Sequence, residues 1–148
     1  LQVTPAKGLL GAAAAPAALA THEVIRTPRV YFWREDDEIR FGATSELGRT
    51  DLEDDPGAIA SLHLEVRRAL PGARFDPAAR MASVGLRPVS SDGAPLVGRD
   101  GPDGCITAVG HGRNGWLLAP LTGLAVAALC GEADPAPIWR DFGPGRFA

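Results

Sequence analysis

The sequence predicts an α+β fold with a mainly antiparallel sheet and flanking helices. Short β-rich runs cluster along the chain, and no helices alternate regularly between them, which argues against a parallel sheet. Two segments have the apolar content and the length of helices, at about residues 56–70 and 116–129. A length of 148 residues with 45% apolar side chains is sufficient for the core of one ordinary domain.

The start of the chain predicts two short strands. Gln2–Thr4 is β-rich, and we expect Pro5 and Gly8 to stop it. Leu9–Ala20 has some features of a secretory signal, but it is mostly alanine without strong hydrophobes, so we do not interpret it as one. Val24–Ile25 predicts the second short strand.

A hairpin is predicted next. Val30–Trp33 and Ile39–Gly42 are β-rich runs on either side of a charged turn, which is the pattern of two antiparallel strands. Because side chains alternate along a strand, Tyr31 and Trp33 should lie on one face and Phe32 on the other.

The helix predicted at about residues 56–70 has a clear start and end. Asp54–Pro56 supplies an acidic cap and a first-turn proline, and Pro71–Gly72 ends the helix. Its apolar stripe consists of Ile59, Leu62, Val66 and Leu70. His63 lies beside this stripe, and we expect it to be a boundary residue rather than a metal ligand.

Three further strands are predicted in the second half of the chain. Ala82–Leu86 is a strand that runs into a turn-rich segment, Arg87–Gly93. Pro95–Gly98 is another short strand. The polar turn Asp100–Gly104 separates it from a buried strand at Ile106–Val109.

The last predicted helix, Trp116–Leu129, is apolar on every side. Such a helix is normally buried, and Gly131 should close it as a C-cap. A chain this short offers few apolar partners for it. We therefore expect it to pack against a further domain or, by self-association, against a second copy.

Composition and charge exclude several classes of function. A net charge of −3 provides no basic field for nucleic acid, and no stretch reaches the roughly 20 apolar residues that span a bilayer. Cys105 and Cys130 have apolar sequence neighbours, so we expect buried thiols, a reducing compartment and a cytoplasmic location. His22, His63 and His111 are scattered and no Cys-x-x-Cys occurs, so no metal site is predicted.

Several segments together carry a family resemblance. They are Val3–Gly8, Gly42–Glu46, Gly85–Pro88, Ser91–Gly98, Gly110–Gly115 and Leu118–Gly123. In this order and spacing they resemble the C-terminal half of the flavin-dependent amino acid oxidases of the glycine oxidase and D-amino acid oxidase type, from about Val3 to Gly131. The resemblance implies an FAD-dependent oxidoreductase that deaminates a small amino acid or amine by hydride transfer from the substrate α-carbon to flavin N5. Departures at Leu9, Arg29, Gly112 and Trp116 affect the expected substrate identity.

Arg87 is the candidate for substrate binding. Almost all basic side chains are arginines, since Lys7 is the only lysine of the chain. The planar guanidinium group of arginine can bind a carboxylate through two parallel hydrogen bonds. The resemblance implies that Arg87 binds the substrate carboxylate. It also implies that the hydroxyl of Tyr31 adds a hydrogen bond to that carboxylate and that the carbonyl of Gly85 accepts one from the substrate amine. Two alternatives stay open: a structural salt bridge from Arg87 to an acid such as Asp92, and an ordinary sheet aromatic at residue 31. No side chain is predicted to act as a catalytic base.

The glycine-rich loop before the last helix is the candidate flavin contact. Its glycines let the backbone approach a flat ligand, and a helix starting near Asn114 would direct free N–H groups and a positive dipole end out of the loop. The alternative is a plain glycine turn before a buried helix. The resemblance implies cofactor contacts from Gly110, His111, Gly112, Arg113, Asn114, Gly115 and Trp116.

Gly110, Gly112 and Gly115 have Gly-x-Gly-x-x-Gly spacing after the strand predicted at Ile106–Val109. The resemblance assigns this loop to contact with the flavin ring, so we predict no Rossmann phosphate site in these residues. We expect FAD binding to need an N-terminal Rossmann domain outside this chain, which would then be a fragment. The expected division is a substrate-binding part at residues 1–109, a flavin-contacting loop and helix at 110–131, and a tail at 132–148. The alternative function is a non-catalytic binding or assembly module derived from such an oxidase.

Overall fold

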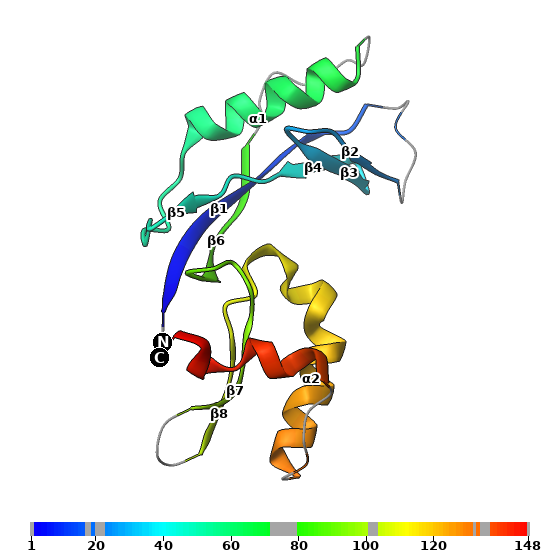
Figure 1. The fold of residues 1–148 in the computed structure, drawn as a ribbon. Coiled ribbons are helices and arrows are strands. Elements are labelled where there is room, and N and C mark those ends of the chain that lie inside the picture. The colour runs from blue at the N-terminus through cyan, green and yellow to red at the C-terminus, as the bar shows by residue number, and fades with distance from the viewer. Residues whose placement is uncertain are drawn as a thin grey trace. The chain divides into compact units, whose positions relative to one another are not determined.

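The computed structural model describes residues 2–16, 19, 23–71, 80–100, 104–131, 133 and 137–147, and its mixed helices and antiparallel strands confirm the predicted α+β class (Figure 1). His22, Gly72 and the centre of the predicted turn at 101–103 lie outside these residues. The strands are β1 (Val3–Ala14), β2 (Val24–Arg26), β3 (Tyr31–Glu35), β4 (Glu38–Gly42), β5 (Glu46–Leu47), β6 (Arg80–Ser90), β7 (Leu96–Asp100) and β8 (Cys105–Val109). The helices are α1 (Pro56–Ala69) and α2 (Gly115–Cys130), with 3₁₀ turns η1 (Gly112–Asn114), η2 (Pro137–Phe142) and η3 (Pro144–Phe147).

The chain divides into two compact units, Lys7–Leu86 and the combination of Leu1–Ala6 with Arg87–Ala148. We describe each unit by itself. This division follows from packing, whereas the division by function at residue 109 stays a prediction.

The main sheet has the strand order β2-β3-β4-β1-β5, and β6 also pairs with β1. Strands β3 and β4 form the predicted hairpin, in which Glu35 pairs with Glu38 and Tyr31 with Gly42. The rings of Tyr31 and Trp33 stack at 6.0 Å, while Phe32 is fully buried. The predicted alternation of these three aromatics is therefore confirmed.

Strand β1 corrects the prediction that the first strand stops at Pro5 and Gly8. It continues to Ala14 and pairs with β4 from Leu10 onward. Both faces of its middle are buried, so the sequence shows no polar alternation. Close packing explains the small residues, since a Cβ on Gly11 would lie only 2.2 Å from the Phe41 ring.

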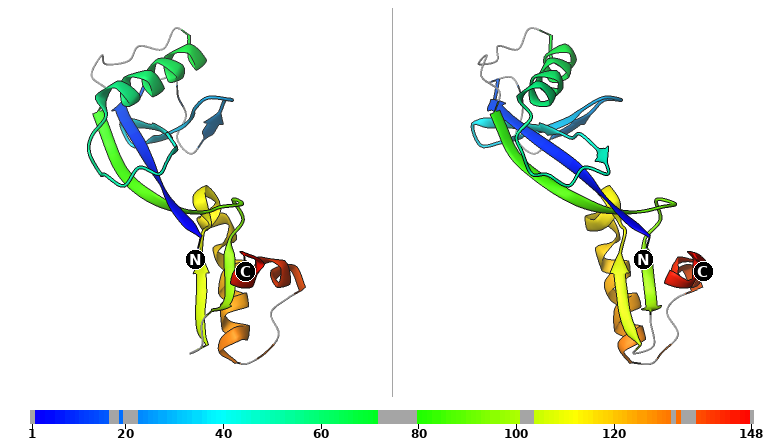
Figure 2. Two further views of the ribbon diagram at one scale, coloured as in Figure 1. Left: turned by 60° about the vertical axis from the view of Figure 1, so that its left-hand side comes forward. Right: turned by 90° about the vertical axis from the view of Figure 1, so that its left-hand side faces the viewer.

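Helix α1 is confirmed from cap to end, and it covers one face of the sheet within its unit (Figure 2). The carboxylate of Asp55 accepts a hydrogen bond from the backbone N–H of Ala58 at 2.9 Å, which is an ordinary N-cap. The prediction that His63 is a boundary residue was wrong. This side chain is buried and stacks on Phe41 with 5.5 Å between ring centres, because the buried stripe of the helix is wide enough to include it.

The second unit contains the antiparallel pair β7–β8 with α2 alongside (Figures 1 and 2). Strand β6 is longer than predicted, and the turn-rich segment begins at Ser91 rather than at Arg87. The residue before a proline is biased toward β geometry, and a proline is tolerated where a strand does not need its N–H. Arg87 therefore lies inside a strand and Pro88 continues it.

Helix α2 matches its predicted bounds within one residue at each end, and Gly131 closes it. The described residues leave most of its apolar surface exposed, and only Ala125 and Leu129 of this helix are buried. Trp116 is 96% exposed.

The prediction of buried thiols was wrong, since Cys105 and Cys130 are both free and exposed. Cys130 ends the uncovered helix α2, and Cys105 begins strand β8. In the described part of the chain, no helix is long and apolar enough to cross a membrane. The same residues contain no group of three or more side chains suited to a metal ion.

Candidate functional site

The loop between β8 and α2 has the backbone geometry that its glycines predict. Gly110 and Gly112 have positive φ angles of 81° and 54°, which other residues rarely adopt. A Cβ on Gly110 would lie 3.2 Å from the Cβ of Ser90, so a larger residue would also be crowded there. Helix α2 begins after Asn114, which does not cap it with its side chain, and the 3₁₀ turn η1 leads directly into it.

A groove of about 460 Å³ lies beside this loop. Its wall is made of small residues of the loop and of α2, so the backbone forms much of its surface. It is lined by Pro88, His111, Gly112, Gly115, Ala119, Thr122, Gly123 and Val126.

The structure brings the strand that carries Arg87 next to the glycine loop. Val89 and His111 form an antiparallel bridge, and Pro88 lines the groove. Arg87 is half-buried and directly precedes Pro88; its own side chain is not among those that line the groove. The other two predicted substrate residues, Tyr31 and Gly85, belong to the unit Lys7–Leu86. Tyr31 is 36% exposed and Gly85 is exposed.

Asp92, the acid proposed as a structural partner for Arg87, forms its ion pair with Arg146. The Arg146 Nε atom donates to Oδ2 of Asp92 at 2.8 Å and Nη2 donates to Oδ1 at 2.9 Å. The Arg146 guanidinium holds the pKa of the Asp92 carboxyl well below its usual range, with further help from the Ala94 N–H and the Ser90 hydroxyl. The alternative of a structural salt bridge at Arg87 stays open.

His111 lies between the loop and the helix. Its Nε2 atom is 2.9 Å from the hydroxyl of Thr122, two turns along α2, and this contact ties the loop to its own helix. Burial lowers the pKa of His111 below the ordinary value of 6.5. Burial thus favours the neutral imidazole.

Nuclear magnetic resonance should show His111 titrating with a midpoint below pH 6.5. The unfolded chain binds this proton near pH 6.5 and the folded chain does not. The stability that neutral His111 contributes is thus complete above pH 6.5 and is lost as the pH falls toward the folded pKa. His111→Gln should reduce the loss of stability below pH 6.5. A midpoint at or above 6.5 would contradict the burial of the ring.

Sequence reasoning missed two charged residues that organise their units. Arg146 is 54 residues from Asp92, and no pattern in the sequence connects them. Lys7 is fully buried, forms an ion pair with Asp51, and donates to the backbone carbonyl of Glu53 at 2.7 Å. Its one signal was that it is the only lysine in an otherwise arginine-based set of cations.

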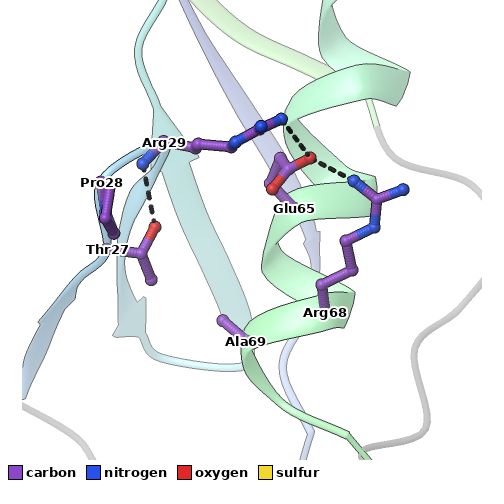
Figure 3. A pocket seen from close by; sticks show the side chains of 6 residues that line it. All are labelled: Thr27, Pro28, Arg29, Glu65, Arg68 and Ala69. Atoms are coloured by element: carbon purple, nitrogen blue, oxygen red, sulfur yellow. Dashed lines mark hydrogen bonds and ion pairs between the residues drawn. The ribbon is translucent and has the colours of Figure 1, made fainter.

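A second pocket, of about 250 Å³, lies between the β2–β3 turn and α1 (Figure 3). Arg29 and Arg68 both point at one oxygen of Glu65, with N···O distances of 3.6 and 2.5 Å. Both arginines are mostly exposed, and exposed ion pairs of this kind contribute little. Because a carboxylate of the chain already occupies these cations, we do not assign this pocket to the function.

Comparison with known proteins identifies the family. The sequence profile described as FAD dependent oxidoreductase matches residues 1–129. The chain is 34% identical to a bifunctional protein ThiO/ThiG of Synechocystis, over 99% of this chain and 23% of that protein. It is also 34% identical to a D-amino acid dehydrogenase of Xanthobacter autotrophicus, over 82% of this chain and 29% of that protein.

A solved structure agrees. The crystal structure of glycine oxidase from Geobacillus kaustophilus superposes with a TM-score of 0.79 and 30% sequence identity, over 97% of this chain and 39% of that one. The chain thus spans between about a quarter and two fifths of the length of these three relatives. The profile match over most of the chain and this agreement in fold show that the chain belongs to the family of FAD dependent oxidoreductases.

Proposed function

We propose that this chain is the substrate-binding and flavin-contacting portion of an oxidoreductase that oxidatively deaminates a small amino acid or amine. The carrying observation is the bridge between Val89 and His111, which joins the strand of Arg87 to the glycine loop. Two of the relatives are named glycine oxidase and D-amino acid dehydrogenase, and these names state substrates of this class. The parts at 1–109, 110–131 and 132–148 keep their expected roles in this proposal.

The residues of the groove fit a flavin edge. Residues 110–116 and the uncapped start of α2 would hold it, because backbone N–H groups and a helix dipole stabilise negative charge beside a flat ring. When bound, FAD would supply the acceptor for the hydride of the substrate α-carbon, and water would hydrolyse the resulting imine to a carbonyl product and ammonia. The adenine dinucleotide is bound by parts of the whole protein outside these 148 residues.

This chain's own residues bind and orient the substrate. The guanidinium of Arg87 binds the carboxylate, and by resemblance the Tyr31 hydroxyl adds a hydrogen bond to it while the Gly85 carbonyl accepts one from the amine. No side chain acts as a base, since positioning a neutral amine provides most of the rate enhancement that the protein must supply. The protein acts in the cytoplasm, a location that suits free thiols such as the two exposed cysteines.

The uncovered helix α2 favours a second candidate, a non-catalytic assembly module. Four large apolar side chains are exposed on it, and such a patch normally marks a packing surface. They are Trp116, Leu117, Leu121 and Leu124. In the leading proposal this surface packs against the rest of the whole protein; in the second it packs against another copy of the chain.

Purification of the whole protein separates the two. We expect visible flavin absorbance that is bleached without oxygen when glycine, sarcosine or D-alanine is added, with release of ammonia from the primary amines. The corresponding carboxamides should bleach it far more slowly, because they lack the carboxylate that Arg87 binds. A colourless protein that self-associates would support the assembly module instead.

A further inference from the structure

The guanidinium of Arg146 is fully used by one turn and its own segment. Arginine has five N–H donors. Two of them bind the Asp92 carboxylate, and three bind the carbonyls of Ala94, Pro95 and Phe142 at 2.7, 2.9 and 2.9 Å. The side chain is only 17% exposed. This set of contacts fixes the guanidinium in one position and orientation.

The turn that Arg146 holds has its own internal bonds. The Ser90 side chain is buried, and its hydroxyl donates to the carbonyl of Ala94. The Asp92 carboxylate accepts a hydrogen bond from the Ala94 N–H at 3.0 Å and lies 3.1 Å from the Ser90 hydroxyl, whose single hydrogen is shared between Asp92 and the Ala94 carbonyl. Each of these side-chain contacts uses Asp92 or Ala94, which are two of the four residues that Arg146 contacts, and the Gly93 N–H also donates to the Ser90 carbonyl at 3.1 Å. Loss of Arg146 would therefore loosen the turn as a whole.

This turn supports the glycine loop directly. A Cβ on Gly110 would lie 3.2 Å from the Cβ of Ser90 and 3.6 Å from the backbone nitrogen of Leu96, so the two backbones are closely packed. Val89, at the start of the same stretch, bridges His111. The loop rests against residues 89–96 over its first two positions. A displacement of the turn would shift the loop backbone.

The segment that carries Arg146 is itself anchored. Trp139 is buried against Val97 and Ala125, and its ring contacts Phe142 edge-on at 5.4 Å. Pro144 lies so close to Gly98 that a Cβ there would be 2.8 Å from it. This segment follows residue 129, where the family profile match ends, whereas the similarity to the ThiO/ThiG relative extends over 99% of the chain.

We propose that Arg146 is a positioning residue for the flavin-contacting loop Gly110–Gly115. It acts through the Asp92 turn and does not touch the cofactor or the substrate. The inference rests on the proposed function for the identity of the ligand, but the mechanical link from Arg146 to the loop does not depend on it. This gives residues 137–147, within the predicted tail, the additional role of supporting the loop.

The test compares Arg146→Gln, Arg146→Lys and Asp92→Asn in the whole protein. Arg26→Gln is the matched control, because Arg26 is an exposed strand residue. Well below each unfolding temperature, Arg146→Gln should weaken FAD binding roughly tenfold and shift the visible flavin spectrum, since a site loses precision when its supporting shell is removed. Arg146→Lys keeps the charge but not the five-donor fork, so it should restore only part of the effect. Arg26→Gln should change neither property.

Hydrogen exchange separates this inference from the proposed function. Amides of residues 110–115 should exchange faster in Arg146→Gln and Asp92→Asn than in the control, whether or not flavin is bound. A folded Arg146→Gln with a lower unfolding temperature, but with unchanged loop exchange and an unchanged flavin spectrum, would overturn the positioning role. If the unaltered protein binds no flavin, the proposed function fails and the exchange data alone decide the inference. If Arg146→Gln does not fold, the lysine and Asp92 variants decide it.

Discussion

Replacing Arg87 by alanine in the whole enzyme raises the apparent KM for a small amino acid substrate roughly a hundredfold or more. The expected size follows from two hydrogen bonds to a charged group at about 1.5–3 kcal/mol each, where every 1.4 kcal/mol is a factor of ten. Steady-state kinetics at fixed oxygen measures the effect. Arg87→Lys should recover part of it, because an ammonium keeps the charge but loses the bidentate fork.

A comparison of substrates with and without the carboxylate group provides a sharper test of Arg87. The unaltered enzyme should strongly prefer an amino acid to its carboxamide, and Arg87→Ala should abolish most of that preference while leaving the KM for the carboxamide almost unchanged. The exposed Arg26→Ala serves as the matched arginine deletion and should leave both substrates unaffected. An unchanged KM for the acid in Arg87→Ala would refute the clamp and would return Arg87 to a structural role.

The elements that the sequence predicted well are those with local physical signals. The cap at Asp55, the spacing of Ile59, Leu62 and Val66, and the charged turn between β3 and β4 each depend on residues close together in the chain. The glycine loop was found for the same reason, since positive φ angles and close approaches leave glycine as the residue of choice.

The errors come from features that depend on distant parts of the chain. Strand β1 is buried on both faces, so its small residues carried no alternation from which to extend it past Pro5. The exposure of Cys130 depends on what covers α2, which the sequence of the helix does not specify. Arg146 is 54 residues from Asp92 in the sequence, and only the fold brings the two side chains together.

Lys7 is the other residue that only the fold reveals, and its replacement by alanine should destabilise the unit Lys7–Leu86 by about 2–3 kcal/mol, within the usual range for breaking a buried interaction network. The side chain is fully buried in the central strand β1 and connects it to the segment after β5. Its ammonium pairs with Asp51, whose carboxylate is also held by the Nε and Nη2 atoms of Arg49 at 2.8 and 2.9 Å. The pKa of the Asp51 carboxyl is accordingly well below its usual range. Alanine would remove both polar contacts and leave a cavity along the buried stem.

Lys7→Met separates the charge from the volume. Methionine fills most of the space of the stem but leaves the part-buried Glu53 carbonyl without the Lys7 donor, so we expect a loss of about 1–2 kcal/mol. Urea unfolding and hydrogen exchange of β1 in the whole protein should rank the three forms as unaltered, methionine, alanine. Since Arg49 keeps Asp51 paired in every variant, the remaining difference between methionine and alanine measures packing alone. Equal stability of the unaltered protein and Lys7→Met would mean that the cost of burying the ammonium cancels its hydrogen bonds, and that Lys7 holds the segment by its stem rather than by its charge.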